Sequence, residues 1–265
     1  MNRALRALPT LLRIGVAETV AYRAEFVVWL LTTTLPLVMM GLWTTVAADQ
    51  KFGNFDEADF VAYYLANLVV RNLTGSWVAW QISEEIRMGS MAMRLLRPIH
   101  PFIAIAASHV AAIPFRSVIA LPFAVILLAS SGADALVRDP VQLILLVPSL
   151  AMAWLITFSI LFALGALAFF VTKAMALLNL YFGLFSVFSG YLLPIEMLPT
   201  VLARIAEWSP FRFMLSLPVE LITRPMPPSE RAMLLGVQLL WTIASVLIAM
   251  FVWRRGVRRF EAVGS

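Results

Sequence analysis

The side chains best able to form ion pairs with another molecule gather in one segment, SEEIRMGSMAMRLLRPIHP at Ser83–Pro101. Long apolar runs lie on both sides of this charged segment, and the other parts of the chain expected to lie in water are the termini, a bend around Lys173, and loops on the far side. Its acids and arginines suit docking through ion pairs. No feature of it marks the oriented Ser, His and acid that a hydrolase needs. We therefore expect the charged segment to receive energy or a signal from another chain.

Other reactive chemistries are excluded by motif. No Gly is followed by Lys, so the phosphate-binding loop GxxxxGK[ST] is absent and the chain cannot hydrolyse ATP alone. HExxH is also absent, and His100 and His109 stand nine residues apart, which is not the spacing of a helical metal pair. The lack of Cys excludes disulfides, iron–sulfur clusters and thiolate zinc sites. We expect no catalytic residue, metal or cofactor in this chain.

Composition defines the class of protein that carries these residues. Apolar residues make up 62% of the 265, charged residues 13%, and the mean hydropathy is +0.89. One soluble core cannot bury that much apolar surface, so the bilayer is the solvent. The apolar runs are continuous rather than alternating, which selects helices over a barrel. The high pI comes from arginines that flank apolar spans, so we expect no nucleic-acid partner.

Apolar runs long enough for a transmembrane helix, ~20 residues, predict the topology. We expect six spans, at Phe26–Ala48, Phe60–Ile82, Phe102–Ser130, Val141–Thr172, Ala174–Leu193 and Arg231–Trp253. With a cytoplasmic N-terminus, 12 of the 20 basic residues and only five of the 15 acids lie inside. The excess of arginine therefore places both termini in the cytoplasm. Residues 1–265 are interpreted as a single all-α membrane domain.

The first 25 residues predict a helix that lies on the membrane surface. Leu5, Leu8, Leu12 and Val16 share one helical face, away from the nearby arginines. This pattern is typical of an interfacial helix on the cytoplasmic leaflet, and Arg13 interrupts the apolar patch that a signal peptide would need. A frayed basic terminus is the alternative.

The extracytoplasmic segment at residues 194–230 is predicted to contain a broken helix. Breaks are expected at Ser189-Gly190 and Pro194, a new helix begins after Pro199, and Pro210 ends it. Its apolar face is formed by Val201, Leu202, Ile205 and Trp208. The chain would leave the membrane, turn and run partly back. The residues assigned to this outer gate are Gly190, Pro194, Pro199 and Trp208. The rest of the segment is expected to pack on the membrane surface, with Ser229 as N-cap of the last span.

Charges inside the predicted spans are rare and basic. All fifteen acids lie in loops or at helix ends, which disfavours an ion-coupled carrier. Arg71, beside Asn67 and Asn72, and Arg116, after Pro114, lie within spans, where an uncompensated Arg costs ~2.5–3.5 kcal/mol or more. One interpretation is a polar translocation path that meets an anionic group of the substrate. The other is packing, with each Arg bonded to Asn side chains or to free carbonyls. The residues assigned to the path are Arg71, Asn72, Arg116 and Asn179.

Two long stretches resemble the membrane subunits of ABC-2 type exporters. EEIRMGSMAMRLLRPIHP at Glu84–Pro101 is similar to that family's E-x-I-R-x-G…LLRP loop. AFFVTKAMALLNLYFGLFSVFSGYLLPIEMLP at Ala168–Pro199 is similar to its fifth-span segment ending in SGY-hydrophobic-P. YRAEF at Tyr22–Phe26 is similar too, so the resemblance covers nearly the whole chain. It departs at Ser90-Met91, where the family often has an acid followed by Leu.

The resemblance implies a half-transporter in a bacterial inner membrane. A second permease copy or a sister permease would complete the path for a hydrophobic or amphipathic substrate, and two ATP-binding subunits would bind ATP and Mg. The loop would carry the coupling helix: Glu84, Glu85, Ile86 and Arg87 would seat in the ATPase, and Gly89 would turn the chain. Arg94, Arg97 and Pro98 would tie the loop to the third span. A solvated loop with interfacial arginines is the alternative.

Two other functions remain open from the residues alone. One is a secondary transporter or channel that works without an ATPase. The other is a membrane assembly protein whose basic loop recruits a partner without transport. We expect membrane lipid to be a partner in every case.

Overall fold

The chain turns back and forth as helices in the computed structural model, which describes residues 9–17, 35–48, 51–171 and 174–260. The α-helices after residue 34 are α3 Leu35–Ala47, α4 Glu57–Thr74, α5 Val78–Arg87, α6 Met91–Leu95, α7 Pro101–Ala111, α8 Ile113–Ala129, α9 Pro140–Ala166, α10 Ala174–Phe188, α11 Thr200–Trp208, α12 Pro210–Met214, α13 Ser216–Thr223 and α14 Pro228–Val257. Short 3-10 turns are η1 Ser131–Ala135, η2 Leu167–Phe169 and η3 Ile195–Met197. The described residues contain no strand beyond an isolated bridge between Phe52 and Phe55. The all-helical prediction is confirmed for this part of the chain.

Three helical stretches of the described residues are long and apolar enough to cross a membrane: Pro101–Ala129, Pro140–Phe169 and Pro228–Val257. They correspond to the third, fourth and sixth predicted spans. Two shorter apolar helices, Leu35–Ala47 and Ala176–Phe188, fall within the first and fifth. Much of the first predicted span, the YRAEF motif and Lys173 lie outside the described residues.

The second predicted span, Phe60–Ile82, is not one continuous helix. α4 ends at Thr74, residues 75–77 are extended or irregular, and α5 begins at Val78. Gly75 caps α4 with φ −62° and ψ 152°, and its N–H donates to the Arg71 carbonyl. The prediction of an uninterrupted helix was wrong because hydropathy alone does not register this break, although Gly and Ser are poor helix formers.

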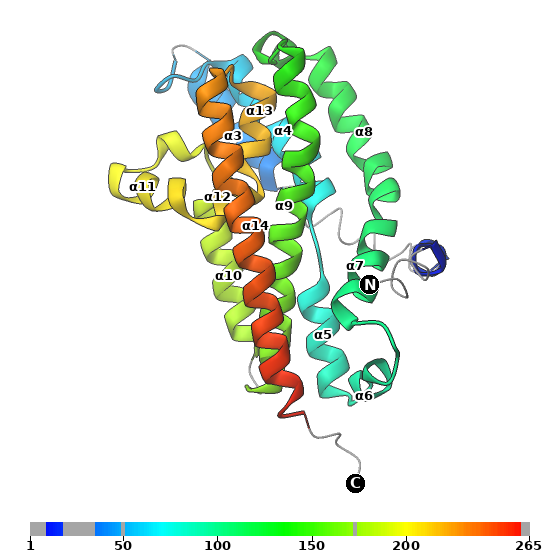
Figure 1. Cartoon of the computed structure of the whole chain (residues 1–265). Helices are drawn as coiled ribbons and strands as arrows, with labels where there is room; N and C mark the ends of the chain where they lie inside the picture. The colour runs from blue at the N-terminus through cyan, green and yellow to red at the C-terminus, as the bar shows by residue number, and fades with distance from the viewer. Residues whose placement is uncertain (1–8, 18–34, 49–50, 172–173, 261–265) are drawn as a thin grey trace.

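Packing of α4 explains how a helix carrying Asn67, Arg71 and Asn72 is tolerated. It lies against α3, α8, α9 and α13, so most of its side chains are buried in protein rather than exposed to lipid. Its first turn is fixed by a capping box, in which Asp56 and Asp59 each accept from the other's backbone N–H at 3.0 Å. The long helix α14 packs along α9 (Figure 1).

The turn between α5 and α7 lies at one end of the bundle, together with the C-terminal end of α14 (Figure 1). The other end holds η1 and the N-termini of α9 and α14. This grouping puts the charged segment, Arg254 and Arg255 at the same end. The arginine distribution predicts that these residues lie on one side of the membrane, and their position at one end of the bundle agrees with that prediction.

The segment after α10 turns back into the bundle. α10 ends at Phe188, α11 begins after Pro199, and its C-cap Ser209 precedes Pro210, as predicted. The remainder differs from the prediction. α13 is buried against α4 and α9 rather than lying on the membrane surface, because Leu217, Val219 and Leu221 pack into the core. The N-cap of α14 is Pro227, so Ser229 lies inside the first turn and is not the cap.

Residues 9–17 form a helix that crosses the long helices and is seen end-on in Figure 1. It contacts α7 closely: a Cβ on Gly15 would lie 2.8 Å from both Ser108 Cα and Ala111 Cβ. Val16, on the predicted apolar face, is exposed, and Leu5 and Leu8 lie outside the described residues. The interfacial position on the cytoplasmic leaflet stays a prediction.

Candidate functional site

The charged segment folds as the last turns of α5, a tight turn and the short helix α6. Gly89 makes the turn at φ +74°, a conformation that favours glycine, so the predicted role of Gly89 in turning the chain agrees with its backbone. Glu85 on α5 accepts two hydrogen bonds from Arg94 on α6, with Nε–Oε2 at 2.6 Å and Nη2–Oε1 at 2.5 Å. The side chains of Glu85 and Arg94 are only 18% and 23% exposed. This ion pair fixes α6 against α5.

The structure divides the predicted coupling residues into two groups. Glu84, Arg87, Arg97 and Pro98 are exposed. Ile86 is buried in the core, and Glu85 and Arg94 are bonded to each other. The exposed group can meet another protein directly. The second group holds the segment in shape.

Exposed apolar side chains on this surface were missed at the sequence level. Met88, Met93 and Leu96 are 73%, 68% and 79% exposed. The sequence alone does not show whether an apolar side chain between two predicted spans faces lipid or water. On a surface that also exposes Glu84, Arg87 and Arg97, they form what we call the α6 surface, which is suited to a protein partner with an apolar groove.

A chain of hydrogen bonds connects the Glu85–Arg94 pair to the break between α4 and α5. Gln81 Nε2 donates to Glu85 Oε1 at 3.3 Å, and Gln81 Oε1 lies 3.3 Å from Nε2 of His109 on α7. The other ring nitrogen of His109, Nδ1, lies 3.1 Å from Ser76 Oγ, which also accepts from Val78 N–H. We call Ser76, Gln81, Glu85, Arg94 and His109 the polar chain. Only the i, i+4 spacing of Gln81 and Glu85 could have been found in the sequence.

Arg116 lies beside this break and is fully buried. Its Nη1 donates to the Gly75 carbonyl, and its guanidinium stacks on the Trp77 ring, 4.6 Å from the centroid. Trp77 in turn lies 4.4 Å from the His109 ring. These contacts favour the packing interpretation of Arg116. The carbonyl it binds is freed at Gly75 rather than near Pro114.

Arg71 has a different environment. It is half-buried, and its guanidinium lies over Phe185 at 4.8 Å and Tyr191 at 6.0 Å. Cation–π contacts of this kind contribute about 0.5–2 kcal/mol, which offsets part of the ~2.5–3.5 kcal/mol cost of a mid-membrane Arg.

The neighbouring amides of α4 bond to backbone carbonyls. Asn67 Nδ2 donates to the Gly190 carbonyl at 3.1 Å, and Asn72 Nδ2 donates to the Leu68 carbonyl at 2.9 Å. Asn179 is exposed on α10. The aromatic contacts of Arg71 involve neither Asn72 nor Asn179, and the assignment of these residues to a translocation path stays a prediction.

The outer breaks are fixed by α4. Gly190 has φ +80°, and its carbonyl accepts hydrogen bonds from Tyr63 at 2.6 Å and Asn67 at 3.1 Å. Tyr64 donates to the Leu192 carbonyl at 2.8 Å. Pro194 and Pro199 are the N-caps of η3 and α11. Trp208 is 64% exposed, and its carbonyl accepts from Trp241 on α14 at 3.1 Å.

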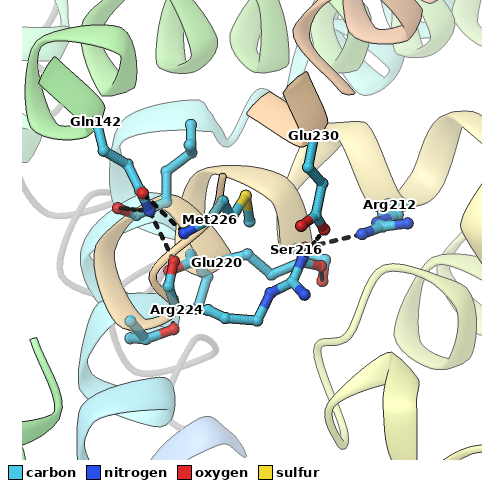
Figure 2. A network of polar contacts seen from close by, with 10 residues as sticks. Gln142, Arg212, Ser216, Glu220, Arg224, Met226 and Glu230 are labelled. Atoms are coloured by element: carbon cyan, nitrogen blue, oxygen red, sulfur yellow. Dashed lines mark hydrogen bonds and ion pairs between the residues drawn. The ribbon is translucent and has the colours of Figure 1, made fainter. Parts of the chain in front are cut away.

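A second polar network holds α13 in the bundle (Figure 2). Glu220 accepts from Arg212 at 2.8 Å and from Ser216 at 2.7 Å, and Arg224 bridges Glu220 to Glu230 at 3.4 and 2.6 Å. Burial raises the pKa of the Glu220 carboxyl, but the charge and hydrogen bonds of Arg212, Ser216 and Arg224 outweigh it, so the net pKa lies below the ordinary value.

The other end of α13 is held by Gln142 on α9. Its Nε2 donates to the carbonyls of Leu221 and Arg224, and its Oε1 accepts from Met226 N–H. This buried side chain therefore satisfies three backbone groups where the chain leaves α13 (Figure 2). Within the described residues, no group of three or more His, Cys, Asp or Glu is placed to hold a metal ion.

The three long apolar helices of the described residues indicate a polytopic helical membrane protein. A family model described as ABC-2 family transporter protein matches residues 24–264. The chain therefore belongs to this family of ABC transporter permeases, whose members are the membrane component that associates with an ABC ATP-binding subunit. A search of curated proteins found no match.

Proposed function

We propose that the chain is the permease subunit of an ATP-driven exporter, with six spans and both termini in the cytoplasm of a bacterial inner membrane. Two ATP-binding subunits, which bind ATP and Mg, drive a pair made of two copies of this chain or of this chain and a sister permease. The substrate is hydrophobic or amphipathic. Family membership supports the permease role, and the shared end of the charged segment and the α14 arginines supports the sidedness.

The observation that carries the proposal is the α6 surface held by the Glu85–Arg94 pair. A docking element that transmits force has to move as one body, and the pair joins α5 to α6 at two points. Met88, Met93 and Leu96 supply the apolar contact, while Glu84, Arg87 and Arg97 supply the charged rim.

The polar chain gives such a movement a route into the membrane. Displacement of α6 acts through Glu85 and Gln81 on His109 and Ser76, which flank the break between α4 and α5. A break in a helix is a place where two rigid parts can change their angle. Closure of the ATPase dimer would thereby switch the access of the path, and the outer gate residues Gly190, Pro194, Pro199 and Trp208 would open on the far side.

The test is co-purification of the tagged permease with its candidate ATPase. Met93→Asp and Leu96→Asp are expected to reduce the retained ATPase about 10-fold or more, since a charge would enter an apolar contact. Val141→Asp is the matched control, because Val141 is also exposed but lies at the N-terminus of α9, at the opposite end. Equal retention by all variants would show that the α6 surface is not the docking site.

The same preparation separates the competing functions. Stimulation of ATP turnover in the reconstituted complex by a panel of lipids and amphiphilic cations supports the exporter. Transport driven by an ion gradient in proteoliposomes without the partner would instead indicate a secondary transporter. A complex that forms but never shows substrate-stimulated turnover would indicate an assembly protein.

A further inference from the structure

Arg71 is placed where a positive charge is hardest to accommodate. We call α4, the break and α5 together the α4–α5 column. Arg71 lies 14 residues after its start at Glu57 and 16 residues before its end at Arg87. At 1.5 Å per residue, Arg71 lies about 21 Å from the outer end of α4. The hydrocarbon core is about 30 Å thick, so the guanidinium lies inside it when the column spans the membrane.

Among the described residues, the Arg71 guanidinium contacts aromatic rings and forms no ion pair. Its guanidinium lies over Phe185 and Tyr191, and the ion pairs of the described residues all involve other side chains. Other arginines that are buried or partly buried have a carboxylate or a carbonyl as partner. Arg212 pairs with Glu220, Arg231 pairs with Asp139, and Arg116 donates to the Gly75 carbonyl.

The surroundings of Arg71 determine what kind of anion could reach it. Phe185 lies on the buried side of α10, and the exposed side of the same helix carries Leu177, Leu180 and Leu184. Trp80, also exposed, stacks on Phe182 of the same helix at 5.3 Å. A small hydrated anion gains nothing from this apolar surface, and it would lose its water to enter the membrane. An anion attached to an alkyl or acyl chain gains both the ion pair and the apolar contact.

We propose that Arg71 is the headgroup site for an anionic amphiphile, a molecule with a phosphate, carboxylate or sulfate group on an apolar tail that lies along the leucines of α10. A planar guanidinium stacked on aromatic rings keeps its N–H edge for such a group. The amphiphile is either a lipid of the membrane or the transported substrate. The second alternative rests on the proposed function, whereas the binding itself does not.

Binding is measured on the full-length permease in neutral detergent, by native mass spectrometry with two lysolipids of identical acyl chain. Lysophosphatidylglycerol is anionic and lysophosphatidylcholine is zwitterionic. We expect the anionic lipid to bind about 10-fold more tightly or better. Arg71→Gln is expected to abolish this preference while leaving the affinity for the zwitterionic lipid unchanged, and Arg71→Lys to retain part of it.

Arg204→Gln is the matched control, since Arg204 is an exposed arginine on α11, within the outer segment. It is expected to leave the preference unchanged. Thermal unfolding of each variant checks that it is folded. Equal affinity for both lysolipids in the wild type, or a preserved preference in Arg71→Gln, would overturn the proposal. Displacement of the lysolipid by millimolar inorganic phosphate alone would overturn the requirement for a tail.

A second arm distinguishes a resident lipid from a substrate. The complex with the ATPase is reconstituted in phosphatidylcholine nanodiscs, and lysophosphatidylglycerol is added. Stimulation of ATP turnover in the wild type but not in Arg71→Gln identifies the amphiphile as a substrate. Arg71-dependent binding without stimulation keeps the headgroup site and identifies a resident lipid. Failure of the ATPase to associate at all would count against the exporter and leave the binding result intact.

Discussion

Glu85 and Arg94 face each other across the turn at Gly89 and form a bidentate ion pair, with N–O distances of 2.6 and 2.5 Å. Both side chains are mostly covered, so water screens the pair less than it screens the exposed contact of Glu84 with Arg87 at 3.9 Å. The pair makes α5 and α6 one rigid element. The charges that identify the segment in the sequence therefore serve partly to shape it and partly to face outward.

Reversing the charge of Glu85 in this pair is expected to disrupt docking of the ATPase. Glu85→Arg places two cations side by side and releases α6 from α5. Hydrogen bonds to charged groups contribute about 1.5–3 kcal/mol, so retention of the ATPase should fall about 10-fold or more. The measurement is co-purification of the ATPase with the tagged permease.

The double variant Glu85→Arg with Arg94→Glu distinguishes shape from direct contact. It restores the pair with the partners exchanged, so a large part of the retention should return. If the double variant binds no better than Glu85→Arg alone, then Glu85 itself contacts the ATPase and the expectation of direct seating is favoured.

The polar chain predicts non-additive stability. Gln81→Leu leaves a ring nitrogen of His109 without its partner. His109→Phe leaves Gln81 Oε1 without its partner and removes one of the two contacts of Ser76 Oγ, which still accepts from the Val78 N–H. Each unsatisfied buried group costs about 1–3 kcal/mol, so both variants should lower the melting temperature. The double variant should cost less than the two losses combined, because one contact is counted twice. Additive losses measured by thermal unfolding would show that the two residues do not interact.

The outer break depends on a glycine. Gly190 has φ +80°, and a Cβ there would overlap the Tyr63 hydroxyl oxygen, which bonds to the Gly190 carbonyl. Gly190→Ala is therefore expected to cost about 2 kcal/mol or more, from the strained backbone and the displaced Tyr63. Gly183→Ala is the matched control, because Gly183 lies within α10 and a Cβ added there would meet no described side chain within 4 Å. It should be neutral or slightly stabilising. Thermal unfolding that ranks the two variants equally would contradict the assigned role of Gly190.

Much of the helical plan could be predicted from periodicity and punctuation. The apolar runs correctly locate α9, α10 and α14, and the prolines at 199 and 210 correctly bound α11. These features are local: a run of apolar residues or a Pro acts on its own stretch of chain. The break at residues 75–77 is also local, but Gly75 and Ser76 are too few to change the hydropathy of a long window.

The site was less predictable because its contacts join distant segments. Ser76 and His109 are separated by 33 residues, and Arg116 and Gly75 by 41. A single sequence does not show which side chain of α7 faces which turn of α5. The burial of α13 could not be predicted for the same reason, since Gln142 on α9 bonds to backbone groups 79 to 84 residues later.

Acid is expected to weaken the packing of α13 through Glu220. Its folded-state pKa lies below the ordinary 4.5, so the ion pairs with Arg212 and Arg224 stabilise the fold above that value and are lost as the pH falls through the folded pKa. The melting temperature of the wild type should therefore begin to drop as the pH falls below about 4.5, and continue to drop through the lower pKa of the folded state. Glu220→Gln should lower the melting temperature at neutral pH, since breaking a buried pair costs about 3–5 kcal/mol, and should show a smaller further drop in acid. Glu207→Gln, at an exposed carboxylate on α11, is the control and should follow the wild type. If Glu220→Gln loses stability in acid as steeply as the wild type, another group is responsible for the acid sensitivity.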